Sequence, residues 1–409
     1  MRILSIGNLY PPHALGGYEV IWRSAVHHLR AAGHDVRVLA ADWRRESVDD
    51  PSEDADVHRE LRWYWHDHAF PHRSTRERVN LERENAAILD RHLAEFEPDV
   101  VSWWAMGGMS LSLIERVRRA GIPAAGFVID DWMVYGPRVD GWQRLIRRFG
   151  PARPALERAA HTPGGLDLGS AATWCFVSEH CRRRAREAGW KLPSTRVVNA
   201  GIDAELFAGP PAPERPWRWR LVYVGRLDRR KGVHTAITAL THLPDQADLS
   251  IVGAGDDDYA TELRELADSL GVGDRVHFER TTRALLPEVY AQADVALFPV
   301  EWEEPWGLVP LEAMAVGRPV VATGTGGSAE YLRDGENCLL HGAGDPQGLT
   351  DCVTRLAGDE VLRSGLRQAG LIDASRFTDV AYNEEVEAIH TAVAGEGVPD
   401  RSLASVLTD

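Results

Sequence analysis

The chain has 409 residues, which is enough for about two domains that each bury a core of their own. Its hydrophobic content of 44% and charged content of 26% are typical of a globular protein. The formal net charge of −15 argues against general binding to nucleic acid or to anionic lipid, because like charges repel each other.

Apolar segments alternate with helical patterns along the chain, which is typical of parallel α/β sheets. The predicted strands fall into two series, at residues 3–6, 36–40, 100–104, 124–129, 174–177 and 195–198, then at 221–224, 248–252, 275–278, 295–300 and 319–323. We therefore predict two doubly wound domains, with a ligand bound between them at the carboxyl ends of the strands.

A stretch rich in proline and small residues, 208–215, separates the two series and is interpreted as a linker. The predicted domains are residues 1–207 and 216–374. The remaining segment, 375–409, is predicted to hold a helix over 377–393 and a frayed end.

The loop after the first strand ends in Gly16 and Gly17, directly before a helix pattern over about residues 18–32. Glycines at a helix N-terminus let the backbone approach an anion with no Cβ in the way. The pair is therefore a candidate anion contact, and a flexible turn is the alternative.

Asp130, Asp131 and Trp132 follow the apolar segment 124–129. Adjacent carboxylates at a strand end are costly unless something binds them, so we expect them to face a ligand rather than to form a satisfied turn. Tryptophan rings stack on the apolar faces of sugars. Core packing explains most tryptophans of the first domain, but Trp104 and Trp132 lie near strand ends and, with Asp131, are candidate acceptor contacts.

Two further features of the first domain invite a functional interpretation. Residues 141–154 form a short basic amphipathic segment that fits either contact with an anionic membrane or acceptor, or a solvated face. His58, His66, His68 and His72 surround a strand candidate at 61–65, but their spacing follows no familiar ligand pattern, so no metal site is predicted.

The second series of strands begins with a basic turn that contains Gly225, Arg226 and Lys231. Arg226 and Lys231 can each neutralise one charge of a diphosphate. The alternative is a solvated basic turn, which is the interpretation we give to Arg229 and Arg230.

A Gly-Ala-Gly sequence at 253–255 follows the next strand and could be mistaken for a dinucleotide-binding loop. Asp258 stands where the third glycine of that motif is expected, and three consecutive aspartates would repel a pyrophosphate. A nicotinamide cofactor is therefore not predicted.

Residues 301–327 predict a loop, a short helix from about residue 310 to Gly317, and a strand. Glu304 lies in the loop, and Glu312 lies in the first turn of the helix. A helix N-terminus offers unpaired N–H groups that suit phosphate, and carboxylates suit sugar hydroxyls.

Taken together, these residues resemble the donor-binding signature of the retaining family-4 glycosyltransferases. The resemblance rests on Glu304-x7-Glu312, Trp306-Gly307-Leu308, Leu311-Glu312-Ala313-Met314, residues 317–322, and the glycine loop 324–327. It implies the GT-B fold, in which two Rossmann-like domains face each other across a cleft. The first domain would bind the acceptor, the second would bind a nucleoside-diphosphate sugar, and the final helix would cross back to the first domain.

The resemblance also implies roles for single residues. Arg226 and Lys231 would contact the α- and β-phosphates, Glu312 would hold ribose hydroxyls, and Glu304 would hold the donor sugar. The other donor contacts that it implies are Gly17, Gly225, Gly255, Arg280, Trp306, Gly307, Leu308 and Val309.

One position departs from the family. The family usually has a histidine near the donor sugar where this chain has Asp130. An ionised carboxylate there would accept hydrogen bonds from a neutral sugar and repel a uronic acid. Arg226, Lys231, Glu304 and Asp130 are the predicted catalytic residues, and a neutral hexose or N-acetylhexosamine is the predicted donor sugar.

We therefore expect an enzyme that transfers a neutral hexose-type sugar from a nucleoside-diphosphate sugar with retention of configuration. The acceptor would be a carbohydrate, a lipid-linked molecule or a small molecule, and neither a metal nor a cofactor is expected. The alternatives are an epimerase or phosphorylase on the same fold, or a catalytically silent nucleotide-sugar-binding protein. No apolar run approaches the ~18 residues of a membrane span. We therefore expect a cytoplasmic protein, with peripheral contact at the membrane as an alternative.

Overall fold

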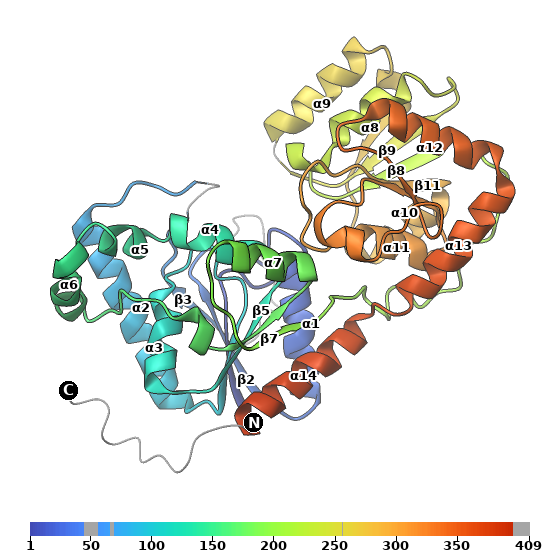
Figure 1. Ribbon diagram of the computed structural model, residues 1–409. Helices are drawn as coiled ribbons and strands as arrows, with labels where there is room; N and C mark the ends of the chain where they lie inside the picture. The colour runs from blue at the N-terminus through green and yellow to red at the C-terminus, as the bar shows by residue number, and fades with distance from the viewer. Residues whose placement is uncertain (45–55, 66–68, 256, 396–409) are drawn as a thin grey trace. The chain divides into compact units, whose positions relative to one another are not determined.

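The computed structural model describes residues 1–44, 56–65, 69–255 and 257–395 (Figure 1). The chain divides into two compact units. Unit 1 contains Met1–Val198 and the chain from Asn383 onward, and unit 2 contains Asn199–Tyr382. Each unit is built on one parallel sheet, which confirms the predicted fold class.

Unit 1 has a seven-stranded sheet in the order β3-β2-β1-β4-β5-β6-β7, and all neighbouring strands are parallel. The strands are β1 (Arg2–Ile6), β2 (Asp35–Ala41), β3 (Val57–Leu61), β4 (Val100–Trp103), β5 (Ala124–Val128), β6 (Thr173–Phe176) and β7 (Thr195–Val197). The helices are α1 (Gly17–Ala31), α2 (Thr75–Phe96), α3 (Ser112–Ala120), α4 (Trp132–Val139), α5 (Gly141–Ile146), α6 (Arg153–Ala160), α7 (Glu179–Glu187) and α14 (Asp379–Gly395), with short 3₁₀ helices at Gly150–Ala152 and Leu168–Ser170. In Figure 1 the sheet lies between α2 and α3 on one side and α1 and α14 on the other.

Helix α1 shows why the sequence folds this way locally. Trp22, Ala25, Val26 and Leu29 are buried, and their spacing places them on one helical face. The Trp22 indole N–H donates to Ser5 Oγ of β1 at 2.7 Å, so the largest side chain of the helix is also satisfied as a hydrogen-bond donor.

Helix α14 packs along α1 through polar contacts as well as apolar ones. Asn383 donates to Ser24 Oγ at 2.9 Å, and the Glu387 carboxylate lies 2.8 Å from His28 Nε2 and 3.1 Å from His34 Nε2. Most of α14 is therefore part of unit 1, although it follows unit 2 in sequence.

Unit 2 has a six-stranded sheet in the order β10-β9-β8-β11-β12-β13, again with parallel neighbours throughout. The strands are β8 (Arg220–Val224), β9 (Asp248–Val252), β10 (Val276–Glu279), β11 (Val295–Phe298), β12 (Val320–Ala322) and β13 (Leu339–Leu340). The helices are α8 (Val233–Leu240), α9 (Asp257–Ser269), α10 (Leu286–Gln292), α11 (Val309–Ala315), α12 (Pro346–Gly358) and α13 (Glu360–Ala374), with 3₁₀ helices at Arg229–Lys231, Gly273–Arg275, Arg283–Leu285 and Gly326–Glu330. Figure 1 shows α8 and α12 on one face of this sheet and α10 and α11 on the other.

One strand prediction was wrong. The strand expected at 61–65 is instead β3, Val57–Leu61, which pairs with β2 through an irregular register at Ala40 and Ala41. Trp63 lies beyond the strand, and its indole N–H donates to the Gly107 carbonyl at 3.1 Å. The aromatic residues after Leu61 therefore pack into the core instead of extending the sheet.

Two further features of the fold concern the cysteines and the hydropathy of the helices. All four cysteines lie in the described part of the chain and are free thiols, three of them buried. Among the described helices, none has both the length and the hydropathy to cross a membrane.

Gly232 connects the 3₁₀ helix Arg229–Lys231 to α8. It has φ of +67°, and a Cβ at this position would lie 1.9 Å from the Pro299 carbonyl oxygen. The turn that carries Lys231 is thus packed directly against the loop after β11.

We predict that Gly232→Ala destabilises the protein by roughly 2 kcal/mol or more, because it adds both a strained φ and a backbone clash. Urea unfolding monitored by circular dichroism would measure the loss. Gly358→Ala is the control, since Gly358 ends α12 without a positive φ and a Cβ added there would meet no atom within 4 Å. Equal stability of the two variants would contradict the close packing at Gly232.

Candidate functional site

Three loops at the carboxyl ends of β8, β9 and β11 meet because neighbouring parallel strands end at the same edge of a sheet. Glycine makes their approach close enough. A Cβ on Gly253 would lie 1.9 Å from the Gly225 carbonyl oxygen, and one on Gly255 would lie 2.3 Å from the Leu227 carbonyl oxygen. Gly225 itself has φ of +150°. The Gly-Ala-Gly sequence is therefore required, at the least, for backbone packing against the basic turn.

Lys231 and Glu304, which were predicted to hold different parts of a donor, contact each other directly. Lys231 Nζ lies 2.5 Å from Glu304 Oε2, and the two side chains are 16% and 14% exposed. The Trp302 indole N–H donates to the same oxygen at 2.8 Å, and Lys231 Nζ lies 5.7 Å from the Trp302 ring centroid. The basic turn after β8 and the acidic loop after β11 thus form one site.

Arg226 differs from its basic neighbours. It is exposed and makes no ion pair with a carboxylate in the described residues. Arg229 pairs with Glu262. Arg230 pairs with Asp228 at 2.6 Å, and this contact holds the pKa of the Asp228 carboxyl at about 2. Arg226 therefore keeps the free guanidinium that an anion would need.

Glu312 lies in the first turn of α11 and is 4% exposed. The Tyr290 hydroxyl donates to its Oε2 at 2.9 Å, and Arg283 Nη1 lies 3.9 Å from its Oε1. Burial raises the pKa of the Glu312 carboxyl, and Arg283 and Tyr290 oppose that rise. The carboxylate is therefore held in a fixed orientation rather than solvated.

The turn between the two glutamates is fixed by aromatic packing. Trp306 is 3% exposed, packs against Tyr331 and Phe377, and donates its indole N–H to the Ala200 carbonyl at 2.8 Å. Gly307 has φ of +87°, and its Cβ would lie 2.8 Å from the Phe298 ring. Leu308 is the N-cap residue of α11, and Val309 is the first residue of that helix.

The glycine loop 324–327 packs against the backbone of Glu304. The Gly327 N–H donates to the Glu304 carbonyl at 2.7 Å, and a Cβ on Gly326 would lie 2.4 Å from the same oxygen. Gly326 also has φ of +64°. These glycines allow the loop to pack against the backbone of the residue that pairs with Lys231.

Arg280 is the one predicted donor contact of unit 2 that stands apart from this packing. Its side chain is 76% exposed and lies 3.9 Å from the similarly exposed Asp257. An exposed pair of this kind contributes little to stability, so Arg280 is free to reorient.

In unit 1, Gly17 is the exposed first residue of α1, and a Cβ added there would meet no atom within 4 Å. The Gly16 N–H before it is satisfied by Glu19 Oε2 at 2.9 Å. The glycine pair therefore begins a helix of fifteen residues with an accessible backbone, as the anion-contact interpretation requires.

Asp130 and Asp131 are both bound by groups of unit 1. Asp130 accepts from the Trp132 N–H at 3.1 Å and from the Tyr135 hydroxyl at 2.8 Å, whereas Asp131 lies 3.3 Å from Arg184 Nη2. Burial raises the pKa of the Asp130 carboxyl to about 6, and the two hydrogen bonds limit the rise. The adjacent carboxylates thus have protein partners, and Asp130 is still largely ionised at pH 7.

The structure does not support acceptor contacts through Trp104 and Trp132. Both rings are almost fully buried, at 1% and 0% exposure. Trp104 stacks between Trp22 and Phe127, with ring centroids 6.0 and 4.8 Å away, and Trp132 packs edge-on against Trp174. Their faces are occupied by the core, which is the outcome that the sequence favours for most tryptophans.

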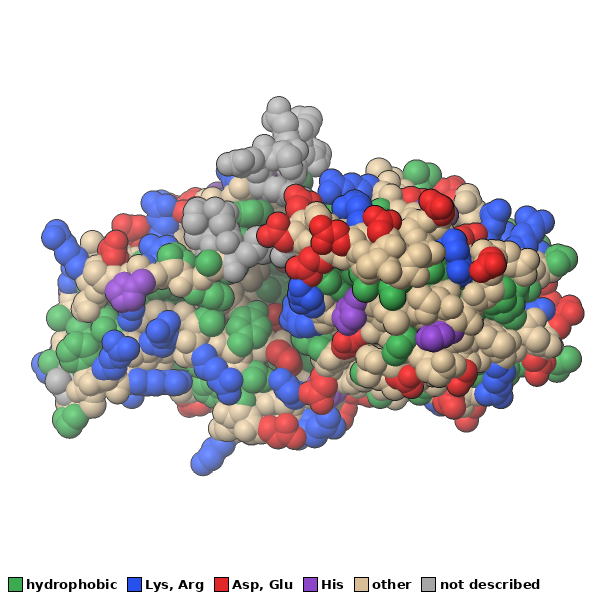
Figure 2. Space-filling view, turned by 90° about the horizontal axis from the view of Figure 1, so that it is seen from above, with side chains coloured by type: hydrophobic (Ala, Val, Ile, Leu, Met, Phe, Trp, Pro, Cys, Tyr) green, Lys and Arg blue, Asp and Glu red, His purple; other side chains and the backbone are tan. Residues whose placement is uncertain are grey.

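The basic segment 141–154 also contributes to the core. Trp142, Leu145 and Ile146 of α5 are buried in a cluster with Tyr64 and Leu81, while Phe149 and the arginines at 144, 147 and 148 are exposed. Its amphipathic pattern is thus explained by packing. In Figure 2, Lys and Arg side chains gather on the lower left of the visible face, and Asp and Glu side chains are more numerous on its right.

Of the four histidines near the strand candidate, His66 and His68 lie outside the described residues. His58 instead lies near Glu60 and His92, with ligand atoms within 4.8 Å of one another. Arg91 pairs with Glu60, and Arg37 Nη1 lies 3.4 Å from His92 Nδ1. Two guanidinium groups already contact this cluster, which weakens its attraction for a cation.

Sequence reasoning missed Tyr290, Arg283 and Trp302, which bind the two predicted glutamates. No spacing rule connects Tyr290 and Arg283 to those glutamates, since they come from the preceding helical segment. Trp302 lies inside the signature stretch, and its position two residues before Glu304 is a usable signal.

Two Rossmann-like units, each built on one parallel sheet, are the architecture of the GT-B fold. The family described as glycosyl transferases group 1 matches residues 211–371, and glycosyltransferase family 4 matches residues 15–206. The chain belongs to the group 1 glycosyltransferases.

Relatives and solved structures agree with this family. The chain is 30% identical to the glycogen synthase of Mycobacterium tuberculosis, over 88% of this chain and 86% of the relative. It is 28% identical to the GDP-mannose-dependent alpha-(1-6)-phosphatidylinositol monomannoside mannosyltransferase of the same species, over 90% and 92%. The fold is similar to the sucrose-phosphate synthase of Thermosynechococcus elongatus (TM-score 0.72, 21% identity, 97% and 100% covered) and to Anabaena HepE in complex with UDP-glucose (TM-score 0.71, 21%, 96% and 100%).

The raised pKa of Asp130 predicts a pH-dependent stability. An acid whose pKa is higher in the folded state stabilises the fold below its unfolded pKa, and that contribution is lost as pH rises through the folded pKa. Relative to wild type, Asp130→Asn should therefore gain about 2 kcal/mol of unfolding free energy between pH 4 and pH 7. Urea unfolding of both proteins over this pH range would measure the difference.

Tyr135→Phe gives the second arm of this experiment. It removes a hydrogen bond that favours the ionised carboxylate, so its stability should keep falling to higher pH than that of wild type. Parallel pH profiles for wild type and Asp130→Asn would show that the carboxyl is solvated in solution.

Proposed function

We propose that the chain transfers a neutral hexose-type sugar from a nucleoside-diphosphate sugar to a carbohydrate, lipid-linked or small-molecule acceptor, with retention of configuration. The observation that carries the proposal is the Lys231–Glu304 pair beside the exposed Arg226, at the carboxyl edge of the unit 2 sheet. Names of relatives support it, since they include a glycogen synthase, a GDP-mannose-dependent mannosyltransferase and a protein solved with UDP-glucose.

The pair suggests how a donor is recognised. In the free chain Glu304 neutralises Lys231. A diphosphate takes over the lysine, and the glutamate then accepts hydrogen bonds from the sugar hydroxyls. Both side chains keep polar partners throughout, because binding exchanges one ion pair for a lysine–phosphate contact and hydrogen bonds from the sugar to the glutamate.

The transfer step needs charge stabilisation at the leaving group. The bond from the anomeric carbon to the β-phosphate oxygen breaks, the acceptor hydroxyl oxygen bonds to that carbon on the same face, and its proton passes to the departing phosphate. Arg226 and Lys231 stabilise the negative charge that develops on the diphosphate. Since these side chains and backbone N–H groups supply the compensation, neither a metal nor a cofactor is part of the proposal.

Asp130 sets the proposed donor class. With a pKa of about 6 the carboxyl is mostly ionised at pH 7. A uronate placed 4 Å away would be repelled by about 4 kcal/mol at an effective dielectric of 20. We therefore propose a neutral hexose or N-acetylhexosamine donor. The cytoplasm is the proposed location, with peripheral contact at the membrane as an option for a lipid-linked acceptor.

The proposal is tested by screening UDP, GDP, ADP and dTDP and their sugars for an increase in melting temperature, followed by assays of the stabilising donor in EDTA. A ligand at 100 times its Kd adds about 2.7 kcal/mol, which is readily seen. Transfer to an added acceptor supports the proposal. Release of an altered free nucleotide sugar indicates an epimerase, a need for pyridoxal phosphate and inorganic phosphate indicates a phosphorylase, and binding without turnover indicates a sensor.

Charge at the leaving group gives a specific prediction. Arg226→Ala and Lys231→Ala should each raise the activation free energy by about 2 to 4 kcal/mol, because each charge acts most strongly as the diphosphate departs. Steady-state kcat/KM would measure the loss. Arg229→Ala is the matched control, as it removes the same charge from the same turn but from a residue paired with Glu262. Wild-type turnover in both test variants would remove them from the site.

The two glutamates should separate nucleotide from sugar recognition. Glu312→Gln is expected to weaken the free nucleoside diphosphate and the full donor alike, by roughly 1.5 to 3 kcal/mol. Glu304→Gln should weaken only the full donor, and it should bind the free nucleotide at least as tightly as wild type, because Lys231 loses its competing carboxylate. Calorimetric titration of both ligands measures this. Equal weakening of the free nucleotide by both variants would contradict the division.

A further inference from the structure

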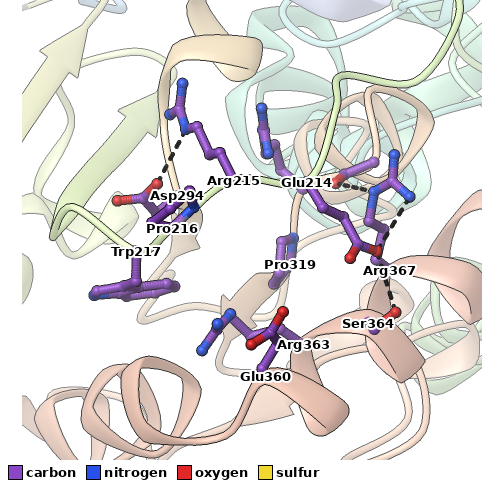
Figure 3. A pocket seen from close by; sticks show the side chains of 12 residues that line it. Glu214, Arg215, Pro216, Trp217, Asp294, Pro319, Glu360, Arg363, Ser364 and Arg367 are labelled. Atoms are coloured by element: carbon purple, nitrogen blue, oxygen red, sulfur yellow. Dashed lines mark hydrogen bonds and ion pairs between the residues drawn. The ribbon is translucent and has the colours of Figure 1, made fainter.

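Unit 2 has a polar pocket at the opposite edge of its sheet from the candidate donor site. The pocket has a volume of about 320 Å³ and is lined by Asp294, Arg318 and Pro319, which directly precede β11 and β12, together with residues 214–217 and one side of α13 (Figure 3). The donor site lies at the carboxyl ends of these strands, and this pocket lies at their amino ends.

Arginine dominates the lining. The pocket contains Arg215, Arg318, Arg363 and Arg367. Glu360, Arg363, Ser364 and Arg367 share one face of α13, because residues three, four and seven positions apart lie along the same side of a helix. Figure 3 shows these α13 side chains facing the segment that carries Glu214 to Trp217.

Only two of the four arginines are paired with carboxylates in the described chain. Arg215 Nε lies 3.3 Å from Asp294 Oδ1, and Arg367 Nη1 lies 3.5 Å from Glu214 Oε1. Arg318 donates to the Ala291 carbonyl at 2.6 Å, and Arg363 donates to two carbonyls of α12, at 2.5 and 3.1 Å. Glu360, the third carboxylate of the lining, is exposed to solvent. Two positive charges are therefore held in place by neutral groups.

Arg318 is buried and has a hydrogen-bond donor that no described residue uses. It is 6% exposed, and its Nε has no hydrogen-bond partner among the described residues. The Trp217 indole nitrogen is likewise buried without a partner in the described structure. Burial, with the nearby Arg215 and Arg367, lowers the pKa of the Arg318 guanidinium to about 10, and the Asp294 carboxylate opposes this shift. A buried, crowded cation with an unused donor is the environment in which an anion binds favourably.

The size and lining indicate the kind of anion. A volume of about 320 Å³ is at the lower end of the range for small-molecule sites and exceeds what a lone phosphate fills. Phosphate oxygens match the forked donors of arginine. Pro216, Trp217 and Pro319 add apolar surface that a sugar ring could contact.

We propose that this pocket binds a small phosphate monoester of about the size of a pentose phosphate, with Arg318 and Arg363 as its principal phosphate contacts. The site is separate from the donor site and does not depend on the proposed transfer reaction.

The pocket is connected to the donor site through α11. Gly317 and Arg318 follow the end of that helix, whose first turn carries Glu312, and Arg367 Nε donates to the Gly317 carbonyl at 3.2 Å. Helix α11 also packs tightly on α13, where a Cβ on Gly370 would lie 2.9 Å from Met314. A ligand that binds Arg318 and the α13 arginines together therefore stabilises the contact between these two helices.

The test is isothermal titration of the full chain with ribose 5-phosphate, ribose and inorganic phosphate. We expect one equivalent of ribose 5-phosphate to bind, ribose not to bind, and inorganic phosphate to bind at least tenfold more weakly than the ester. Equal affinity for inorganic phosphate and ribose 5-phosphate would overturn the assignment to an ester, and failure of ribose 5-phosphate to bind at millimolar concentration would overturn the site.

Variants locate the binding. Arg363→Gln, at a half-buried position, should weaken ribose 5-phosphate at least tenfold, and Arg318→Lys should do the same if its unfolding midpoint is retained. Arg355→Gln, an exposed change on α12 outside the lining, and Arg226→Ala at the donor site should leave the affinity unchanged. Unchanged binding in Arg363→Gln, or loss of binding in Arg226→Ala, would place the ligand elsewhere and overturn the proposal.

Discussion

The parallel direction of every paired strand is the constraint on which the site depends. It brings the loops after β8, β9 and β11 to one edge of the unit 2 sheet, although they are far apart in sequence. Gly253 and Gly255 then allow the loop after β9 to approach the loop after β8 at backbone contact distance, and Gly232 allows the same approach to the loop after β11. A basic turn and an acidic loop that would be independent surface features in another topology are thereby forced together.

That juxtaposition explains how the site tolerates its own charges. Lys231 and Glu304 are both largely shielded from water, and each would be costly without the other. The buried carboxylate of Glu312 would also be costly without partners. Tyr290 of α10 donates a hydrogen bond to it, and Arg283 of the preceding 3₁₀ helix lies close enough to stabilise its charge. The site is therefore arranged before any ligand enters, with its polar groups oriented by neighbours rather than by solvent.

Much of this could be predicted from the sequence, because local patterns decide it. Strand and helix alternation indicated the two-sheet architecture, and the position of Glu312 in a helical first turn followed from Pro310 and Gly317. The partners of each side chain could not be predicted in this way. Whether Lys231 meets a phosphate or Glu304 depends on the packing of distant loops, and whether Trp104 stacks on a sugar or on Phe127 depends on how the core fills.

The residues that follow β3 show the same limit. Leu61 to Trp65 has the composition of a strand, yet β3 ends at Leu61, because Trp63 is bound by the Gly107 carbonyl instead of continuing along β2. The composition of a segment predicts that it will be buried. Its backbone conformation depends on the tertiary contacts that its side chains make.

Helix α14, the last helix in the described part of the chain, completes unit 1, and this has a consequence for biosynthesis. Residues 1–198 leave the ribosome first, but α14 emerges only after all of unit 2 has been made. Until then Ser24, His28 and His34 lack the partners that Asn383 and Glu387 provide, and the surface that Val386 and Ile389 bury stays uncovered. Cotranslational folding of the first unit therefore cannot finish before the second unit has been synthesised.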